Sequence, residues 1–187
     1  MVGQVSDDRA APSAPGVFVN YRHEDTQGTA WALVFQLEAR FGPENVFFDN
    51  GTLRPGMQWF DEIKAHASSA GTLLSLIGPR WLPSLIAHMK PGGEPDYVAK
   101  EIELALRAQP RVSIIPVVID DTDPPSERDL PLCLKALAGK HVEHLRHSHL
   151  REDIDRLIER LEELRIGAQP STAKRGTAAR EVQEAAR

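Results

Sequence analysis

Arg22 is the side chain best suited to bind a ligand in the N-terminal part of the chain. It lies in residues 17–25 (VFVNYRHED), where a short apolar run changes abruptly to charge. A guanidinium group can clamp phosphate oxygens, so Arg22 and its neighbour Tyr21 could flank a ribose or phosphate group. The alternative is a salt bridge from Arg22 to Glu24 or Asp25.

Asp49 marks a second place where an apolar run, Val46 to Phe48, ends in a charged residue. Its side chain either caps the following loop or lies near a pocket, and we favour capping. Further apolar runs end at residues 78–81 and 120–121. Open α/β sheets bind ligands outside the carboxyl ends of their strands, so these segments are candidates for a binding site.

The familiar catalytic and metal-binding signatures are absent from the sequence. No G-x-G-x-x-G follows a strand and no Walker lysine loop occurs, which excludes a standard dinucleotide-binding or P-loop enzyme. No HExxH motif or Cys/His ligand set is present. Four histidines cluster late in the chain, but their spacing fits no ligand pattern, so we expect exposed residues and no metal site. They are His141, His144, His147 and His149.

Strand-like and helix-like segments alternate along the chain five times. The expected strands are 17–21, 46–49, 72–77, 112–120 and 141–145, and the expected helices are 29–41, 57–69, 96–108, 130–137 and 150–164. Asp96 is a candidate N-cap for the third helix. Pro116 suggests that the fourth strand is an edge or carries a bulge. The alternation predicts an α/β fold, an open five-stranded parallel sheet with helices on both faces.

Three segments resemble, in order and spacing, the sequence boxes of the TIR (Toll/interleukin-1 receptor) domain family, in its bacterial branch. They are residues 17–25, residues 46–56 (VFFDNGTLRPG) and residues 96–102 (DYVAKEI). The third is similar to the family's WVxxE turn, with Tyr97 where tryptophan is commoner. The resemblance covers roughly residues 16–164 and implies a flavodoxin-like TIR fold.

The resemblance implies that Glu101 is catalytic, because NAD-cleaving TIR domains use the glutamate of this turn. Cleavage of the nicotinamide–ribose bond passes through an oxocarbenium-like state, as in glycoside hydrolysis. One carboxylate can stabilise that cation, and nicotinamide leaves as a neutral base without a general acid. The alternative for Glu101 is a solvated residue paired with Lys100 or Arg107. Glu103, two positions away, should point to another side of the helix.

Substrate contacts are expected from Tyr21, Arg22 and Asp49, which lie at or directly after strand ends, and the resemblance adds Tyr97 and Trp59. In NAD-cleaving relatives an aromatic at the position of Trp59 stacks on a nucleotide ring, and core packing is the alternative role.

The loop of Leu53, Arg54, Pro55 and Gly56 resembles the BB loop, which contacts neighbouring TIR domains and gates the pocket. Its alternative is a rigid turn with no partner. The resemblance therefore implies a homo-oligomer or filament on activation.

Bulk composition is that of one globular domain with tails. The net charge of −5 gives no electrostatic case for nucleic acid or an anionic membrane. No apolar run approaches the ~20 residues of a membrane span, and the N-terminus has no apolar signal region. The single cysteine, Cys133, suits a reducing compartment. We expect a cytoplasmic protein with a disordered leader at 1–15, a TIR domain at 16–165 and a linker or tail at 166–187.

Taken together, the sequence favours a NAD+ nucleosidase with NAD+ as substrate and no cofactor, activated by self-assembly in bacterial immune defence. A fused sensor domain beyond residue 165 is one expected partner. One alternative is a non-enzymatic signalling scaffold, and another is a virulence effector that binds host TIR adaptors. The two enzymatic outcomes, linear or cyclic ADP-ribose, stay open.

Overall fold

The computed structural model describes residues 16–48, 71–90, 92, 95–108 and 112–168, except the side chains of residues 165–168. A five-stranded sheet has the strand order β2-β1-β3-β4-β5, and all neighbouring strands are parallel. The strands are β1 Val17–Asn20, β2 Val46–Phe48, β3 Thr72–Ile77, β4 Ser113–Ile119 and β5 Glu143–Leu145. The predicted α/β fold with an open parallel sheet is confirmed.

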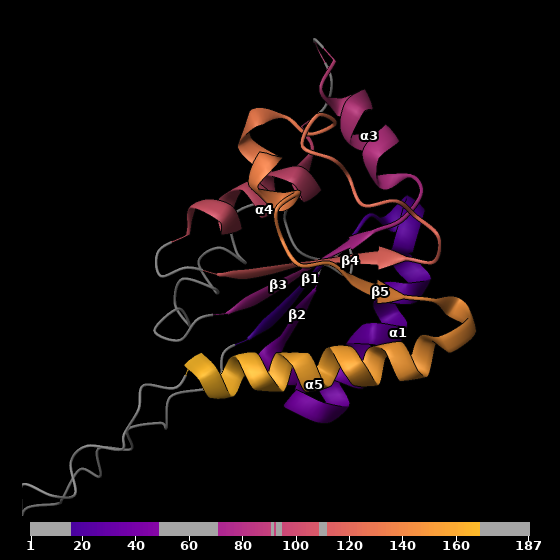
Figure 1. The fold of residues 1–187 in the computed structure, drawn as a ribbon, viewed down its shortest axis with the longest axis vertical. Helices are drawn as coiled ribbons and strands as arrows, with labels where there is room; N and C mark the ends of the chain where they lie inside the picture. The colour runs from indigo at the N-terminus through magenta and orange to yellow at the C-terminus, as the bar shows by residue number, and fades with distance from the viewer. Residues whose placement is uncertain (1–15, 49–70, 91, 93–94, 109–111, 169–187) are drawn as a thin grey trace, which may run out of the picture.

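Helices cover both faces of this sheet, as Figure 1 shows. One face carries α1 His23–Phe41 and α5 Leu150–Ala168, and the other carries α3 Trp81–His88, α4 Tyr97–Arg107 and the 3-10 helix η2 Leu132–Leu137. Two further 3-10 turns are η1 Pro43–Asn45 and η3 His147–His149. Each face buries its own hydrophobic core, as expected for a parallel sheet covered on both sides.

Side chains along β1 and β3 alternate between these two cores. Val17 and Val19 pack toward α1 and α5, whereas Phe18 packs toward α3 and α4. Two polar residues, Asn20 on β1 and Ser75 on β3, take the next positions on the α3/α4 face, and both are buried. They stand where a hydrophobic residue would continue the core.

Helix α1 begins at His23, six residues before the predicted start at 29. Thr26 has non-helical angles (φ −126°, ψ 17°), so a kink separates this first turn from the rest of the helix. Asp25 accepts hydrogen bonds from the backbone N–H groups of Gly78 (3.1 Å) and Arg80 (2.9 Å). The acidic first turn thus binds the backbone just before α3, a long-range contact that local periodicity does not reveal.

Helix α3 lies inside residues 78–95, for which the sequence predicts no helix. Pro83 is the third residue of α3, where its missing N–H has no intrahelical partner to lose. Helix α4 was predicted correctly: the Asp96 side chain accepts a hydrogen bond from the Ala99 N–H at 3.0 Å and caps it. The predicted helix at 57–69 lies outside the described residues.

The prediction that Pro116 marks an edge strand is wrong, because β4 pairs with β3 on one side and β5 on the other. Pro116 itself is opposite Ser75 of β3, while the described ladder to β5 begins at Val117. The proline therefore lies just outside the pairing with the short strand β5. An interior strand can accept it there although it has no backbone N–H to donate.

Candidate functional site

The sheet changes its direction of winding between β1 and β3. From β1 the chain adds β2 on one side, then crosses over to add β3, β4 and β5 on the other. Ligands of open parallel sheets bind outside the carboxyl ends of the strands at such a switch point. Asn20, the last residue of β1, lies there opposite Ser75 of β3.

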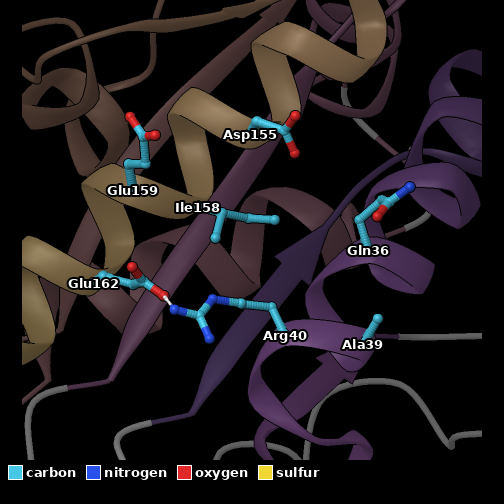
Figure 2. Close-up of a pocket in the computed structure, with 7 residues that line it drawn as sticks. All are labelled: Gln36, Ala39, Arg40, Asp155, Ile158, Glu159 and Glu162. Atoms are coloured by element: carbon cyan, nitrogen blue, oxygen red, sulfur yellow. Dashed lines mark ion pairs between the residues drawn. The ribbon is translucent and has the colours of Figure 1, made fainter.

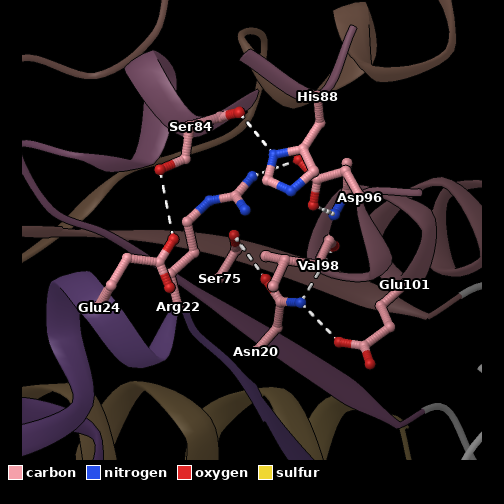
Figure 3. Close-up of polar contacts among 10 residues, drawn as sticks. Asn20, Arg22, Glu24, Ser75, Ser84, His88, Asp96, Val98 and Glu101 are labelled. Carbon is pink, nitrogen blue, oxygen red and sulfur yellow. Dashed lines mark hydrogen bonds and ion pairs between the residues drawn. The ribbon is translucent and has the colours of Figure 1, made fainter. Parts of the chain in front are cut away.

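A buried hydrogen-bond network joins this switch point to the first turns of α4, as Figure 3 shows. Asn20 Nδ2 donates to the backbone oxygen of Val98 (3.2 Å) and to Oε2 of Glu101 (2.7 Å). Ser75 Oγ donates to Asn20 Oδ1 at 3.2 Å. The network attaches the start of α4 to the middle of the sheet by polar contacts.

Glu101 is buried, with 9% of its surface exposed. The alternative role, a solvated helix residue, is therefore wrong. Arg107 pairs instead with Glu103, with Nη2 and Oε1 2.8 Å apart. The two glutamates of α4 thus occupy different environments, as their separation of two residues predicts. A carboxyl group held in a buried position can meet a cationic reaction centre without much competing water.

Arg22 forms a buried ion pair with Asp96, the N-cap of α4. Arg22 Nη2 and Asp96 Oδ2 are 2.5 Å apart, and the two side chains are 4% and 9% exposed. The guanidinium carbon lies 5.7 Å from the centre of the Trp81 ring. The predicted alternative, a salt bridge to Glu24 or Asp25, is wrong because the partner comes from α4. A phosphate contact from Arg22 stays a prediction.

The other predicted site residues divide between the two faces of the sheet. Tyr97, the first residue of α4, is 44% exposed and lies on the same helix as Glu101. Tyr21 is buried in the core beneath α1 and α5, with its ring 5.0 Å from that of His23. The structure therefore does not bring Tyr21 together with Glu101. Asp49, Leu53, Arg54, Pro55, Gly56 and Trp59 lie outside the described residues.

The four late histidines are exposed, as predicted. His147 contacts Asp120 through Nδ1 and its backbone N–H, and its Nε2 lies 3.1 Å from Thr29 Oγ1. Hydrogen bonds from the backbone and then the side chain of His147 hold the pKa of Asp120 below its usual 3.8. This contact links the ends of β4 and β5 to α1. Among the described residues, no group of three or more His, Cys, Asp or Glu is placed to hold a metal ion.

An open hollow of about 490 Å³ lies between α1 and α5, on the face of the sheet away from Glu101 (Figure 2). It is lined by Gln36, Ala39, Arg40, Asp155, Ile158, Glu159 and Glu162. Arg40 forms an ion pair with Glu162 across it. The carboxylates that line the hollow are exposed or half-buried, so none of them is comparable to the buried carboxyl of Glu101.

Asn20 and Ser75 are the residues of this network that the sequence analysis did not single out, although Asn20 lies within the box of residues 17–25. The signal that could have found them is a break in the apolar pattern, because each is a polar residue beside apolar neighbours in a buried strand (VFVN and TLLSLI). Asp96 was predicted only as a cap, and its pairing with Arg22 spans 74 positions. No local pattern carries that information.

No helix in the described part of the chain is long and apolar enough to cross a membrane.

Comparison with known families agrees with this architecture. A sequence model of the TIR domain matches residues 17–162, which is well over half of the chain. No curated protein matches the chain. The matched region runs from the first residue of β1 into α5 and includes the whole network around Glu101. The chain therefore belongs to the TIR domain family.

Proposed function

We propose that this TIR domain is a NAD+ nucleosidase that cleaves the bond between nicotinamide and ribose, with Glu101 as the catalytic residue. The products are nicotinamide and ADP-ribose, in linear or cyclic form. The observation that carries the proposal is a buried carboxyl group at the switch point of a parallel sheet. Glu101 is 9% exposed and is held from β1 through Asn20.

The chemistry requires one anionic group beside the ribose. As the C–N glycosidic bond breaks, its electron pair leaves with the nicotinamide nitrogen, which becomes neutral. The ribose carbon develops the positive charge of an oxocarbenium ion, and the carboxylate of Glu101 stabilises it electrostatically. Water then adds to that carbon and loses a proton to give ADP-ribose. An internal nucleophile in place of water gives the cyclic product.

Other residues have supporting roles in this proposal. The Arg22–Asp96 pair fixes the N-terminus of α4, which places Glu101 over the end of β1. Tyr97, exposed at the start of the same helix, is a candidate contact for NAD+, and Trp59 is the candidate for stacking on a ring of the substrate. Contacts from Tyr21 and Asp49 remain predictions of the sequence.

Self-association is the proposed activating step, with the loop of residues 53–56 as the contact between neighbouring domains. A loop that closes the site in the monomer would be drawn aside by a neighbour, so assembly would favour the active state by mass action. A head-to-tail contact would let the assembly grow into a filament. A sensor domain fused beyond residue 165 would supply the trigger, and bacterial immune defence is the proposed setting.

The test is a NAD+ cleavage assay on purified protein, with Glu101→Gln and Glu103→Gln as a matched pair on one helix. Glu101→Gln keeps the side-chain shape and removes the charge, so cleavage should fall at least ~10²-fold. Glu103→Gln, which breaks the partly exposed pair with Arg107, should leave cleavage almost unchanged. Full activity in Glu101→Gln would sink the assignment. Wild-type protein that is inactive when dilute, concentrated and crowded would favour the scaffold alternative.

A further inference from the structure

We propose that Asn20 is the positioning residue for Glu101 and that its side-chain amide holds the carboxyl group in one orientation. The effect on catalysis rests on the proposed NAD+ cleavage. The contact between the two side chains does not depend on that proposal.

The contacts of Asn20 fix which way its amide points. The backbone oxygen of Val98 can only accept a hydrogen bond, so the amide atom 3.2 Å from it must be Nδ2. The same nitrogen lies 2.7 Å from Oε2 of Glu101, and Oδ1 on the other side accepts from the Ser75 hydroxyl. A flipped amide would place Oδ1 against two acceptor oxygens. The N–H aimed at Glu101 is therefore dictated by its surroundings.

Each part of this amide has a partner. The two N–H groups go to Val98 and Glu101, which are three residues apart on α4, and the carbonyl oxygen goes to β3. Asn20 is 1% exposed and Ser75 is 0% exposed. A satisfied amide in a buried site has little freedom to rotate. Glu101 therefore accepts a hydrogen bond from a well-fixed side chain at the end of a strand.

The position of Asn20 argues against a purely structural role. Its neighbours on this face of the sheet include Phe18, Leu73 and Ile77, all in the hydrophobic core. Burying an amide there carries a desolvation cost that an apolar side chain would avoid. Local departures from the expected pattern are typical of functional sites. Within the described part of the chain, the ionisable side chain that Asn20 contacts is Glu101.

Orientation matters because the carboxylate must face a cation that forms at one carbon of the substrate. Holding a catalytic group within a narrow range of angles lowers the barrier without changing ground-state binding. Loss of Asn20 should therefore lower kcat and leave KM nearly unchanged. A residue that merely holds α4 on the sheet would instead lower thermal stability, with kcat retained in the folded fraction.

The decisive variant is Asn20→Asp, which keeps the shape and replaces the N–H donor by a carboxyl oxygen. Two carboxylates at this distance cannot both ionise readily. The acid limb of the pH profile for kcat should move to higher pH by about one unit or more, and activity should recover in alkali. Asn20→Ala should lower kcat about tenfold. It should move the acid limb in the same direction but by less, because it removes a hydrogen bond to the carboxylate without adding a second carboxyl group.

Other charged groups around the network stay as they are in these variants. Arg22 and Asp96 pair with each other, Glu103 pairs with Arg107, His88 contacts a backbone oxygen through Nδ1, and Lys100 is exposed on α4. A limb displaced further in Asn20→Asp than in Asn20→Ala therefore reports on Glu101. Ser75→Ala, which releases only the amide oxygen, should give a smaller loss of kcat and serves as the second variant if Asn20→Asp does not fold.

A readout that needs no activity separates the two proposals. Carboxyl ¹³C NMR should show Glu101 titrating at higher pH in Asn20→Asp than in the wild type, with Glu103 unchanged. The positioning role is overturned if the titration of Glu101 is the same in Asn20→Asp and in the wild type. It is also overturned if the wild type is active and the folded Asn20 variants have the same pH profile of kcat. If the wild type does not cleave NAD+ but Asn20→Asp still shows the NMR shift, the proposed reaction is overturned and the contact between Asn20 and Glu101 is established.

Discussion

Asp96 has two structural tasks, and replacing it should be costly. Its Oδ1 accepts the hydrogen bond from the Ala99 N–H that caps α4, and its Oδ2 pairs with the buried guanidinium of Arg22. Loss of an N-cap costs about 1 kcal/mol. Removing one partner of a buried ion pair costs about 3–5 kcal/mol, because the other charge stays buried and unpaired. Asp96→Ala should therefore lower the free energy of unfolding by roughly 4 kcal/mol, allowing for overlap between the two terms.

Two further variants separate the cap from the charge. Asp96→Ser keeps a capping oxygen and removes the carboxylate, so it should be about 1 kcal/mol less destabilising than Asp96→Ala. The double variant Arg22→Met, Asp96→Ser removes both charges and keeps the cap. It should recover most of the lost stability, since replacing both partners of a buried pair is often nearly neutral.

The measurement is urea unfolding followed by far-UV circular dichroism, with denaturant slopes compared to confirm that the unfolded states match. A loss below about 1 kcal/mol in Asp96→Ala is the size expected of an exposed pair. Such a result would refute the buried Arg22–Asp96 pair. A double variant no more stable than Asp96→Ser would show that the unpaired cation is not the source of the loss.

Three other outcomes follow from the same structure and sequence. Because His147 lowers the pKa of Asp120 below 3.8, the ionised carboxylate stabilises the fold above that pH, and this contribution disappears as the pH falls through the folded-state pKa. Asp120→Asn, which suits the positive φ of 50°, should therefore lower Tm at neutral pH and match the wild type in strong acid. Trp59→Ala should raise KM for NAD+ by the equivalent of ~1–3 kcal/mol if the ring stacks on substrate; an unchanged KM with a large fall in Tm indicates a core residue. Leu53→Asp should reduce light scattering and specific activity at high protein concentration, and a wild-type activity that stays flat over a roughly hundredfold dilution would contradict activation by assembly.

The fold was predictable because its signals are local. In α4, Ile102 and Ala105 recur at helical spacing and Asp96 supplies an N-cap, and the structure places all three as expected. The strands β1 to β4 each contain a short apolar run, so their succession along the chain could be read directly, whereas β5 (EHL) has no such run. The topology follows from alternation with helices, since parallel strands need crossover connections.

The errors arise where long-range contacts override local patterns. The first turn of α1 carries Glu24 and Asp25, whose partners lie on or just before α3. Pro83 resembles a helix breaker until its place in the first turn of α3 is known. Arg22 has two acidic neighbours in sequence but pairs with Asp96 across 74 positions. Sequence spacing cannot rank such partners, because the fold decides which charges meet.

The candidate site was only half visible for the same reason. Family resemblance points to Glu101. Asn20 lies in the first box but carries no charge, Ser75 lies outside the boxes, and each is a polar residue in a largely apolar strand. Their meaning appears only when the register brings them side by side beneath α4. A polar residue in a buried strand carries a cost unless it is hydrogen-bonded. Ser75 bonds to Asn20, and Asn20 bonds to the buried carboxyl group of Glu101. Two polar residues that meet in this way at the switch point of a sheet are better explained by the needs of that carboxyl group than by those of the core.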